Sequence, residues 1–188
     1  VNNEIYFEFI NDFVVFFFFL QSSNSFNIIS KYCKEVSNND PNLEYDFCVA
    51  SLEDASSKLQ PPPTNLETLV EISIQLTKSN GTNVLSIISK FLKDKRFDTY
   101  RHACLQDCSK LYSDSLSNLD RALVALKSKD FDTAATMLSS SMDSPNTCEE
   151  QFNEKKGEKS PLTKKNQVYS QLNLLSLVLL QMFHKQHH

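Results

Sequence analysis

Glycine is scarce in this chain of 188 residues, which contains only Gly81 and Gly157. Phosphate-binding loops, dinucleotide-binding fingerprints and tight β-hairpin turns need glycine at fixed positions. The composition therefore excludes the common nucleotide-binding enzymes. Tryptophan is absent, and the six prolines avoid the long apolar stretches, as expected if those stretches are helices. We interpret the chain as mostly α-helical.

An excess of positive charge is also lacking. The formal net charge is −4, and the 19 Lys and Arg residues are spread along the sequence. The sequence therefore predicts no binding to nucleic acid. The densest basic stretch runs from Lys155 to Lys159 and is followed by Lys164 and Lys165. A solvated loop between helices is the favoured interpretation of this stretch, and a docking surface for an acidic partner is the alternative.

Histidine is too sparse and too scattered to complete a catalytic centre. His102 is alone near the start of a predicted helix, and His184, His187 and His188 lie in or beside a polar C-terminal tail. An enzyme needs a nucleophile, a base and an orienting group brought together, and a polar chain end is more often frayed than metal-binding. We expect no catalytic residue, no metal site and no cofactor.

The apolar run Phe13–Leu20 has the length of the core of a secretory signal peptide and is too short to span a bilayer. Ser23 and Ser25 supply the small residues that precede a cleavage site. We therefore predict that residues 1–25 are a signal peptide and that the mature chain starts near Phe26. The acidic residues before the run depart from the usual positive start of such signals, and the alternative is a buried amphipathic helix.

Four long segments carry apolar residues at helical spacing and are joined by short connectors: 65–94, 98–127, 132–152 and 163–184. Such segments most simply build an up-down-up-down four-helix bundle. The seam of the last segment is expected to consist of Val168, Leu172, Leu175, Leu179 and Met182.

The predicted fold class is all-α, with a helical hairpin at residues 26–55 ahead of the bundle at 65–184. The proline run Pro61–Pro63 separates the two parts. We treat residues 26–188 as one domain.

Five cysteines leave at least one thiol unpaired if the protein is secreted. Cys33 and Cys48 flank a turn-rich segment, residues 36–42, that lies between two short amphipathic pieces. A disulfide between them would close a local helical hairpin. A loop of this size contributes about 3 kcal/mol in the chain-entropy model.

A second disulfide follows from antiparallel packing of the segments 98–127 and 132–152. Folding the chain about residue 129 or 130 brings Cys108 opposite residue 151, and Cys148 lies within one helical turn of that residue. We therefore predict the pair Cys108–Cys148. Cys104 lies one turn, ~5.4 Å, further from the fold point. We predict that Cys104 is a free thiol that fills space on a helix face, with a reactive thiol as the alternative.

The segment Asn80–Thr82 forms the single glycosylation sequon of the chain. Asn80 is therefore a candidate glycan site if the protein passes through the secretory pathway. The Asn80–Gly81 pair is also expected to weaken the middle of the helix at 65–94.

These features predict a disulfide-clamped helical bundle whose function is binding. Two classes of protein remain. The first binds another protein, either to block it or to present something to it, and the second carries a small apolar ligand between its helices. The seams filled with Leu, Ile and Phe favour a packed core over a ligand cavity.

The cysteine spacing resembles that of the plant inhibitors of invertase and pectin methylesterase. The resemblance covers about residues 26–184 and is carried by Cys33, the segment Tyr45–Leu52, the segment Ala103–Tyr112 and Cys148. It implies a four-helix bundle with an N-terminal hairpin, and four cysteines that pair first to second and third to fourth. It also implies a secreted inhibitor, not an enzyme, that acts as a monomer in a 1:1 complex in the cell wall or the vacuole.

Within that family the residues look more like the invertase-inhibitor branch. The likeness is carried by Cys148–Phe152, by Lys159–Pro161 and by Asn166. The segments Lys127–Phe131, Glu154–Gly157 and Ser160–Lys164 resemble pollen allergens of this branch, which implies allergenicity.

The turn between the second and third bundle helices departs from the pattern of the cell-wall invertase inhibitors. That pattern is Pro-Lys-Phe, and its Lys enters the acidic sugar site, whereas this chain has Lys129-Asp130-Phe131. A carboxylate would be repelled by the paired carboxylates of a glycosidase, but Lys129 offers a cation one residue earlier. Asp130 or Asp132 is also expected to cap the third helix, with Phe131 as its hydrophobic staple.

The favoured hypothesis is inhibition of an acid invertase through the contact residues Lys129, Asp130 and Phe131. A pectin methylesterase inhibitor that blocks the pectin groove with a bundle face is the alternative. A carrier of a small apolar ligand is a more distant alternative.

Overall fold

The computed structural model describes residues 27–186. The predicted signal peptide at 1–25 and its cleavage site lie outside the described residues. A helical segment at residues 27–39 is followed by five further helices: α2 (Tyr45–Ser56), α3 (Leu66–Phe91), α4 (Thr99–Lys127), α5 (Phe131–Asn153) and α6 (Thr163–Lys185). No strand occurs between residues 27 and 186. The all-α fold class is confirmed.

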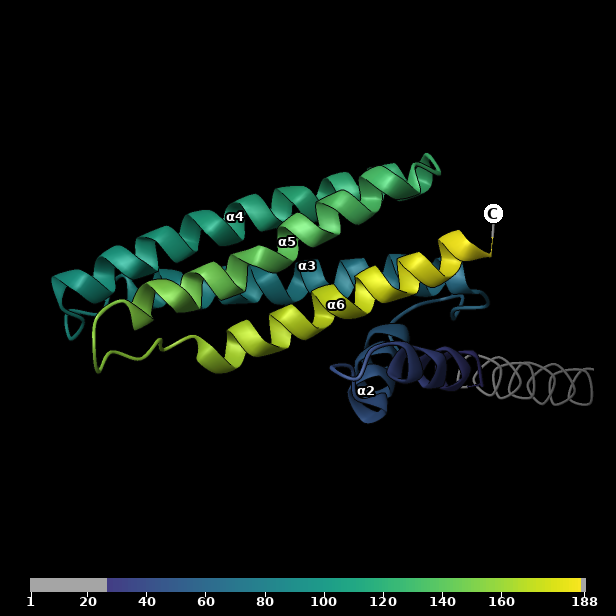
Figure 1. Cartoon of the computed structure of the whole chain (residues 1–188), viewed down its shortest axis with the longest axis horizontal. Coiled ribbons are helices and arrows are strands. Elements are labelled where there is room, and N and C mark those ends of the chain that lie inside the picture. The colour runs from purple at the N-terminus through teal and green to yellow at the C-terminus, as the bar shows by residue number, and fades with distance from the viewer. Residues whose placement is uncertain (1–26, 187–188) are drawn as a thin grey trace, which may run out of the picture.

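Helices α3–α6 form the predicted up-down-up-down bundle (Figure 1). Each helix packs against its neighbour in sequence, and α6 closes the ring by packing against α3. The α4–α5 turn lies at the same end of the bundle as the last residues of α6, and the α3–α4 and α5–α6 connections lie at the opposite end. The two ends therefore present different parts of the sequence.

Side-chain caps fix where three of the bundle helices begin. Asn65, Asp98 and Asp130 precede α3, α4 and α5. A side-chain oxygen of each accepts a hydrogen bond from the backbone N–H three residues on, at 2.8, 2.8 and 3.1 Å. Such caps satisfy backbone donors that have no partner within the helix.

Gly81 lies inside α3, and the helix continues through it. The expected weakening of the helix at this point stays a prediction. A Cβ atom at Gly81 would lie 2.8 Å from Cε2 of Tyr169 and 3.0 Å from a methyl carbon of Leu116. Glycine therefore allows the Tyr169 ring of α6 to approach the α3 backbone. Tyr169 is fully buried, whereas its neighbour Val168, which we placed in the seam, is 36% exposed. The predicted register of α6 was wrong at that position.

Pro145 lies inside α5 and is buried, an exception to the expected absence of proline from helices. Proline has no N–H, so the carbonyl of Ser141, four residues earlier, loses its helical partner. The Oγ of Ser115 in α4 donates a hydrogen bond to this carbonyl at 3.1 Å and lies 2.6 Å from the hydroxyl of Tyr169. A buried polar cluster thus compensates for the proline and joins α4, α5 and α6.

The hairpin before the bundle comprises the helical segment 27–39 and α2, and α2 contacts α3. The hairpin turn faces the bundle. Pro41, Asn42 and Glu44 line an open groove of about 680 Å³ together with residues of α5 and α6. None of the helices among residues 27–186 combines the length and the hydrophobicity that a membrane span requires.

Candidate functional site

The turn between α4 and α5 is tight and has a defined backbone. Lys129 adopts the left-handed conformation, with φ 60°. Its N–H donates to the carbonyl of Leu126 at 3.0 Å, and the N–H of Asp130 donates to that of Ala125 at 2.9 Å. This pair of bonds is the Schellman motif, in which glycine is the usual residue at the left-handed position. The motif fixes the direction in which the turn leaves the bundle.

The side chain of Lys129 reaches back onto the bundle. Its ammonium group forms an ion pair with Glu67 in the first turn of α3 and lies 5.6 Å from the ring centroid of Phe183. The side chain is still 56% exposed. Lys129 is thus a positioned cation at the rim of the turn, accessible to a partner.

Asp130 is the N-cap of α5 and is one of the two residues that we expected to cap this helix. Its carboxylate accepts the backbone N–H of Thr133. Hydrogen bonds from the Thr133 side chain and backbone lower the pKa of Asp130 below its usual range. The negative charge of Asp130 is therefore turned toward the start of α5, where the helix dipole favours it.

Phe131 is the first residue of α5 and is directed onto α6. Its ring centroid lies 5.3 Å from that of Phe183 and 5.1 Å from that of His184. A hydrophobic staple requires the residue before the cap, so the expected staple role was wrong. Phe131 instead fixes the turn against α6.

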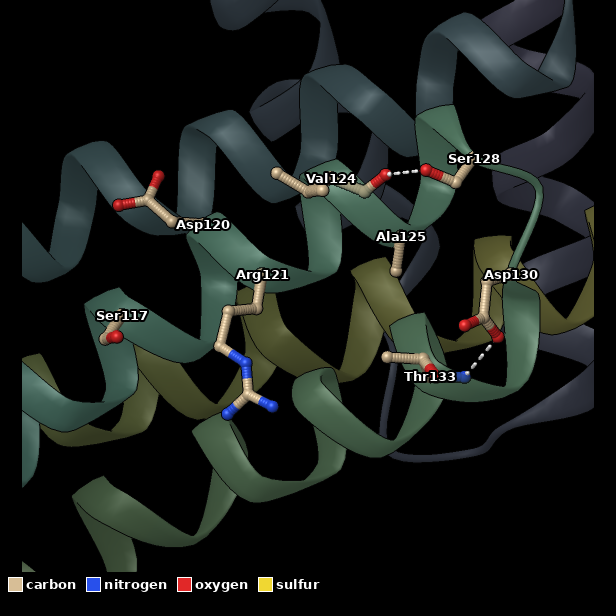
Figure 2. Close-up of a pocket in the computed structure, with 8 residues that line it drawn as sticks. All are labelled: Ser117, Asp120, Arg121, Val124, Ala125, Ser128, Asp130 and Thr133. Carbon is tan, nitrogen blue, oxygen red and sulfur yellow. Dashed lines mark hydrogen bonds between the residues drawn. The ribbon is translucent and has the colours of Figure 1, made fainter.

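An open groove of about 430 Å³ borders the turn on the outer side of α4 and the start of α5 (Figure 2). Arg121 and Val124 line it from α4, and Asp130 and Thr133 line it from the α5 side. Val124 is 66% exposed. No carboxylate of residues 27–186 lies within ion-pair distance of the exposed Arg121 guanidinium.

Sequence reasoning missed Arg121 and Val124. The available signal was a charged and an apolar residue one turn apart on α4, close to the turn. Together with Lys129 they give this end of the bundle two exposed cations beside an apolar side chain.

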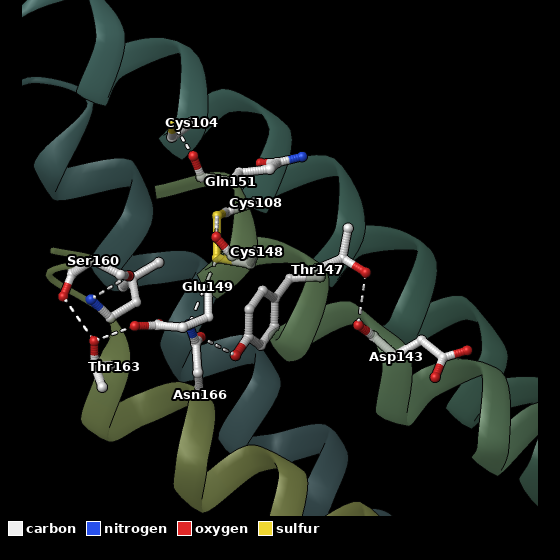
Figure 3. The surroundings of a disulfide bond; sticks show 12 residues. Cys104, Cys108, Asp143, Thr147, Cys148, Glu149, Gln151, Ser160, Thr163 and Asn166 are labelled. Atoms are coloured by element: carbon white, nitrogen blue, oxygen red, sulfur yellow. Dashed lines mark hydrogen bonds between the residues drawn. A yellow bond between two sulfur atoms is a disulfide. The ribbon is translucent and has the colours of Figure 1, made fainter. Parts of the chain in front are cut away.

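The structure contains the two expected disulfides, Cys33–Cys48 and Cys108–Cys148, with Cα–Cα distances of 5.6 and 5.0 Å. Cys104 is a free, buried thiol. Its Sγ faces the carbonyl oxygen of Gln151 at 3.8 Å (Figure 3). Burial raises the pKa of the Cys104 thiol, which favours the inert space-filling role over the reactive one.

A hydrogen-bond network surrounds the Cys108–Cys148 disulfide (Figure 3). Asn166 in α6 donates to one carboxylate oxygen of Glu149 at 2.8 Å and accepts the hydroxyl hydrogen of Tyr112 at 2.8 Å. Thr163 donates to the other Glu149 oxygen at 2.5 Å. Both carboxylate oxygens of Glu149 thus hold α5 to α6, which is a structural role.

Asn80 lies in the middle of α3 and is half-buried. Thr82, the third residue of its sequon, donates a hydrogen bond to the carbonyl of Lys78 at 2.9 Å. Glycosylation of Asn80 stays a prediction. Within residues 27–186 no three His, Cys, Asp or Glu side chains are grouped to hold a metal ion.

Residues 27–179 match the model of the family described as "Plant invertase/pectin methylesterase inhibitor". The chain belongs to this family. It is thus classed with enzyme inhibitors and not with enzymes.

Two relatives from plane trees carry the name "Putative invertase inhibitor". The protein from Platanus acerifolia is 37% identical over 88% of this chain and 92% of its own length. The protein from Platanus orientalis is 38% identical over 86% of this chain and 91% of its own length. "Pectinesterase inhibitor 12" from Arabidopsis thaliana is 34% identical over 93% of this chain and 99% of its own length.

Solved structures support the fold. A crystal structure of a mutant form of a pectin methylesterase inhibitor from Arabidopsis superimposes with a TM-score of 0.62, covering 74% of this chain and 90% of that one at 21% identity. A second inhibitor structure, from Arabidopsis thaliana, gives a TM-score of 0.58 over 82% and 94% of the two chains, also at 21% identity.

Proposed function

We propose that this member of the family is a secreted inhibitor of a plant acid invertase. It acts as a monomer in a 1:1 complex and places the α4–α5 turn in the substrate cleft. Residues 1–25 are removed in this proposal, and the mature protein acts in the cell wall or the vacuole. The observation that carries the proposal is the turn at the end of a disulfide-clamped bundle, where the side chain of Lys129 stays 56% exposed although it pairs with Glu67.

The charge of this turn suits the cleft of a glycosidase. Such clefts contain a pair of carboxyl groups that flank the scissile bond. Lys129 and Arg121 bring two exposed cations to the same end of the bundle. Asp130 holds the position at which other inhibitors carry Lys, but its carboxylate binds the start of α5, which limits its repulsion of the cleft. We assign the contacts to Lys129, Arg121 and Val124, with Phe131 as a positioning residue.

The rigidity of the turn supports tight binding. The Schellman motif, the Asp130 cap and the packing of Phe131 on Phe183 hold the turn in one conformation. The Cys108–Cys148 disulfide joins the two helices that carry it. A preorganised element loses little conformational entropy on binding.

Inhibition of a pectin methylesterase is the second candidate, favoured by the 34% identity to a pectinesterase inhibitor over 93% of the chain. Paired assays separate the two candidates. The oxidised protein is added in increasing amounts to a cell-wall invertase, with sucrose hydrolysis as the readout, and to a pectin methylesterase, with methanol release as the readout. We expect sucrose hydrolysis to fall until one inhibitor is present per enzyme, with methanol release unchanged. Loss of methanol release alone would establish the second candidate.

The carrier hypothesis has less support. Tyr112, Leu119 and Tyr169 are among the fully buried side chains that occupy the space between the bundle helices. A tightly packed core leaves little room for an apolar ligand.

A further inference from the structure

Basic residues are concentrated in two connecting segments. Residues 90–101 and 154–165 together contain ten Lys and Arg but only four Asp and Glu, although the whole chain has a net charge of −4. The first segment joins α3 to α4, and the second joins α5 to α6. The remaining residues are correspondingly acidic, so the charge of the chain is strongly asymmetric.

The fold brings these two segments together at the end of the bundle opposite the α4–α5 turn (Figure 1). Arg101 forms an ion pair with Glu158 at 2.7 Å, and Lys155 lies 3.4 Å from Asp98. These ion pairs cross from one segment to the other and hold both in place.

Three of the four acidic residues in the two segments are engaged in ion pairs. Asp98 and Glu158 are engaged as described, and Asp94 pairs with Arg96 at 2.6 Å. Seven exposed lysines have no carboxylate within ion-pair distance among residues 27–186, and we call them the basic end: Lys90, Lys93, Lys95, Lys156, Lys159, Lys164 and Lys165. Unneutralised charge of this density attracts a polyanion.

The composition of the basic end narrows the class of polyanion. All seven cations are lysines, which act as point charges and lack the planar fork with which Arg reads phosphate. Single-stranded nucleic acid requires exposed aromatic rings for stacking. Among residues 27–186 the exposed aromatic side chain is Tyr45, which belongs to α2 and not to the basic end. Val168 is the single exposed large apolar residue of α6, and one such side chain buries too little apolar area to anchor the protein on a membrane surface. A carboxylate polymer recognised by charge alone fits these features best.

We propose that the basic end binds an acidic polysaccharide, with a run of uronate carboxylates as the recognised group. A pectin methylesterase, one of the two enzymes for which the family is named, converts methyl esters into such carboxylates. The 29 residues of α4 place the basic end about 43 Å from the turn. The protein can therefore be held on the polysaccharide while the turn remains free for an enzyme, a role that goes beyond inhibition.

The test compares retention of the purified protein on immobilised polygalacturonate and on immobilised, fully methyl-esterified pectin. We expect retention on polygalacturonate only, at about 50 mM salt, with release by about 500 mM salt because surface charges are then screened. The quadruple variant K93E/K95E/K159E/K164E should bind polygalacturonate at least about tenfold more weakly. The matched control K31E/K34E/K58E/K185E changes the net charge equally and should retain binding.

Three results would overturn the proposal: equal retention on the esterified polymer, equal loss in both variants, or binding to single-stranded DNA or anionic vesicles without binding to polygalacturonate. Circular dichroism of both variants verifies folding. The sucrose assay contains no polycarboxylate, so this proposal and the proposed inhibition of invertase fail independently.

Discussion

Lys129 occupies a left-handed backbone position at which a non-glycine residue is strained. Replacing Lys129 by Gly removes both this strain and the cation. We predict that K129G keeps the melting temperature of the wild type within about 3 °C, since the relief of strain offsets the greater freedom of the unfolded chain. Inhibition of invertase should nevertheless weaken at least about tenfold, as expected for loss of a central charged contact.

Lys127→Ala is the matched control for this variant. Lys127 is also an exposed lysine near the turn, paired with Glu71 at 3.5 Å, but we assign it no contact with the enzyme. Inhibition curves and thermal unfolding of the three proteins would be compared. Equal potency of K129G and the wild type would remove Lys129 from the contact surface.

Ser115 compensates for the proline inside α5, because its hydroxyl binds the carbonyl that Pro145 leaves without a partner. Ser115→Ala should lower the free energy of unfolding by about 1–3 kcal/mol, the cost of an unsatisfied buried carbonyl. In a Pro145→Ala background the backbone N–H is restored, so the same substitution should cost about 1 kcal/mol less. Urea unfolding of the four proteins measures this coupling, and a coupling of zero would show that the two residues act independently.

Sequence reasoning at the residue scale succeeded where the partners are close in the chain. The cap at Asp130 binds a backbone group three residues away. It failed for ion pairs between residues that are remote in the sequence. Lys129 pairs with Glu67, which lies 62 residues earlier in the sequence, and helix periodicity does not show which side chains meet at the end of a bundle.

At the scale of elements, the two disulfides clamp different parts of the molecule. Cys108–Cys148 closes a loop of 40 residues within the bundle, and Cys33–Cys48 closes one of 15 in the hairpin. The chain-entropy model predicts losses of about 4 and about 3 kcal/mol in the free energy of unfolding when each pair is replaced by Ala. Urea unfolding measures both losses.

The oxidised protein should contain one thiol, Cys104, which reacts with a thiol reagent only after unfolding because it is buried. This titration is the control for the disulfide variants. More than one reactive thiol in the oxidised wild type, or rapid labelling of the folded protein, would contradict the assignment.

The segment after α5 is held by an ion-pair network that is sensitive to pH. Hydrogen bonds from Arg101 and Lys155 lower the pKa of Glu158 below its usual range. A carboxyl group with a lowered pKa in the folded state stabilises the protein above its usual pKa, and this contribution is lost as the pH falls through the lowered value. Glu158→Gln should therefore lower the melting temperature by about 1–3 °C near pH 6 and have no effect at a pH low enough to protonate Glu158.

Glu154→Gln is the control for this experiment, because Glu154 forms no ion pair within residues 27–186. Thermal unfolding of both variants and the wild type would be followed across this pH range. A pH-independent effect of Glu158→Gln would show that packing, and not charge, is lost.

At the scale of the whole molecule, the bundle was predictable because four long amphipathic segments with short connectors leave few alternative arrangements. The asymmetry of charge was not fully predictable. The lysines at 155–165 were visible in the sequence, but those at 90–95 join them only because antiparallel helices return both connections to one end. The α4–α5 turn and the basic end thus lie at opposite ends of the bundle.

The kinetic mode of invertase inhibition tests most directly whether the turn enters the substrate cleft. Sucrose hydrolysis by an acid invertase would be measured over a range of sucrose concentrations at several fixed amounts of the oxidised protein. The account predicts that the apparent KM for sucrose rises with the amount of protein while kcat stays constant. A fall in kcat at constant KM, or full hydrolysis at a molar excess of the protein, would contradict it.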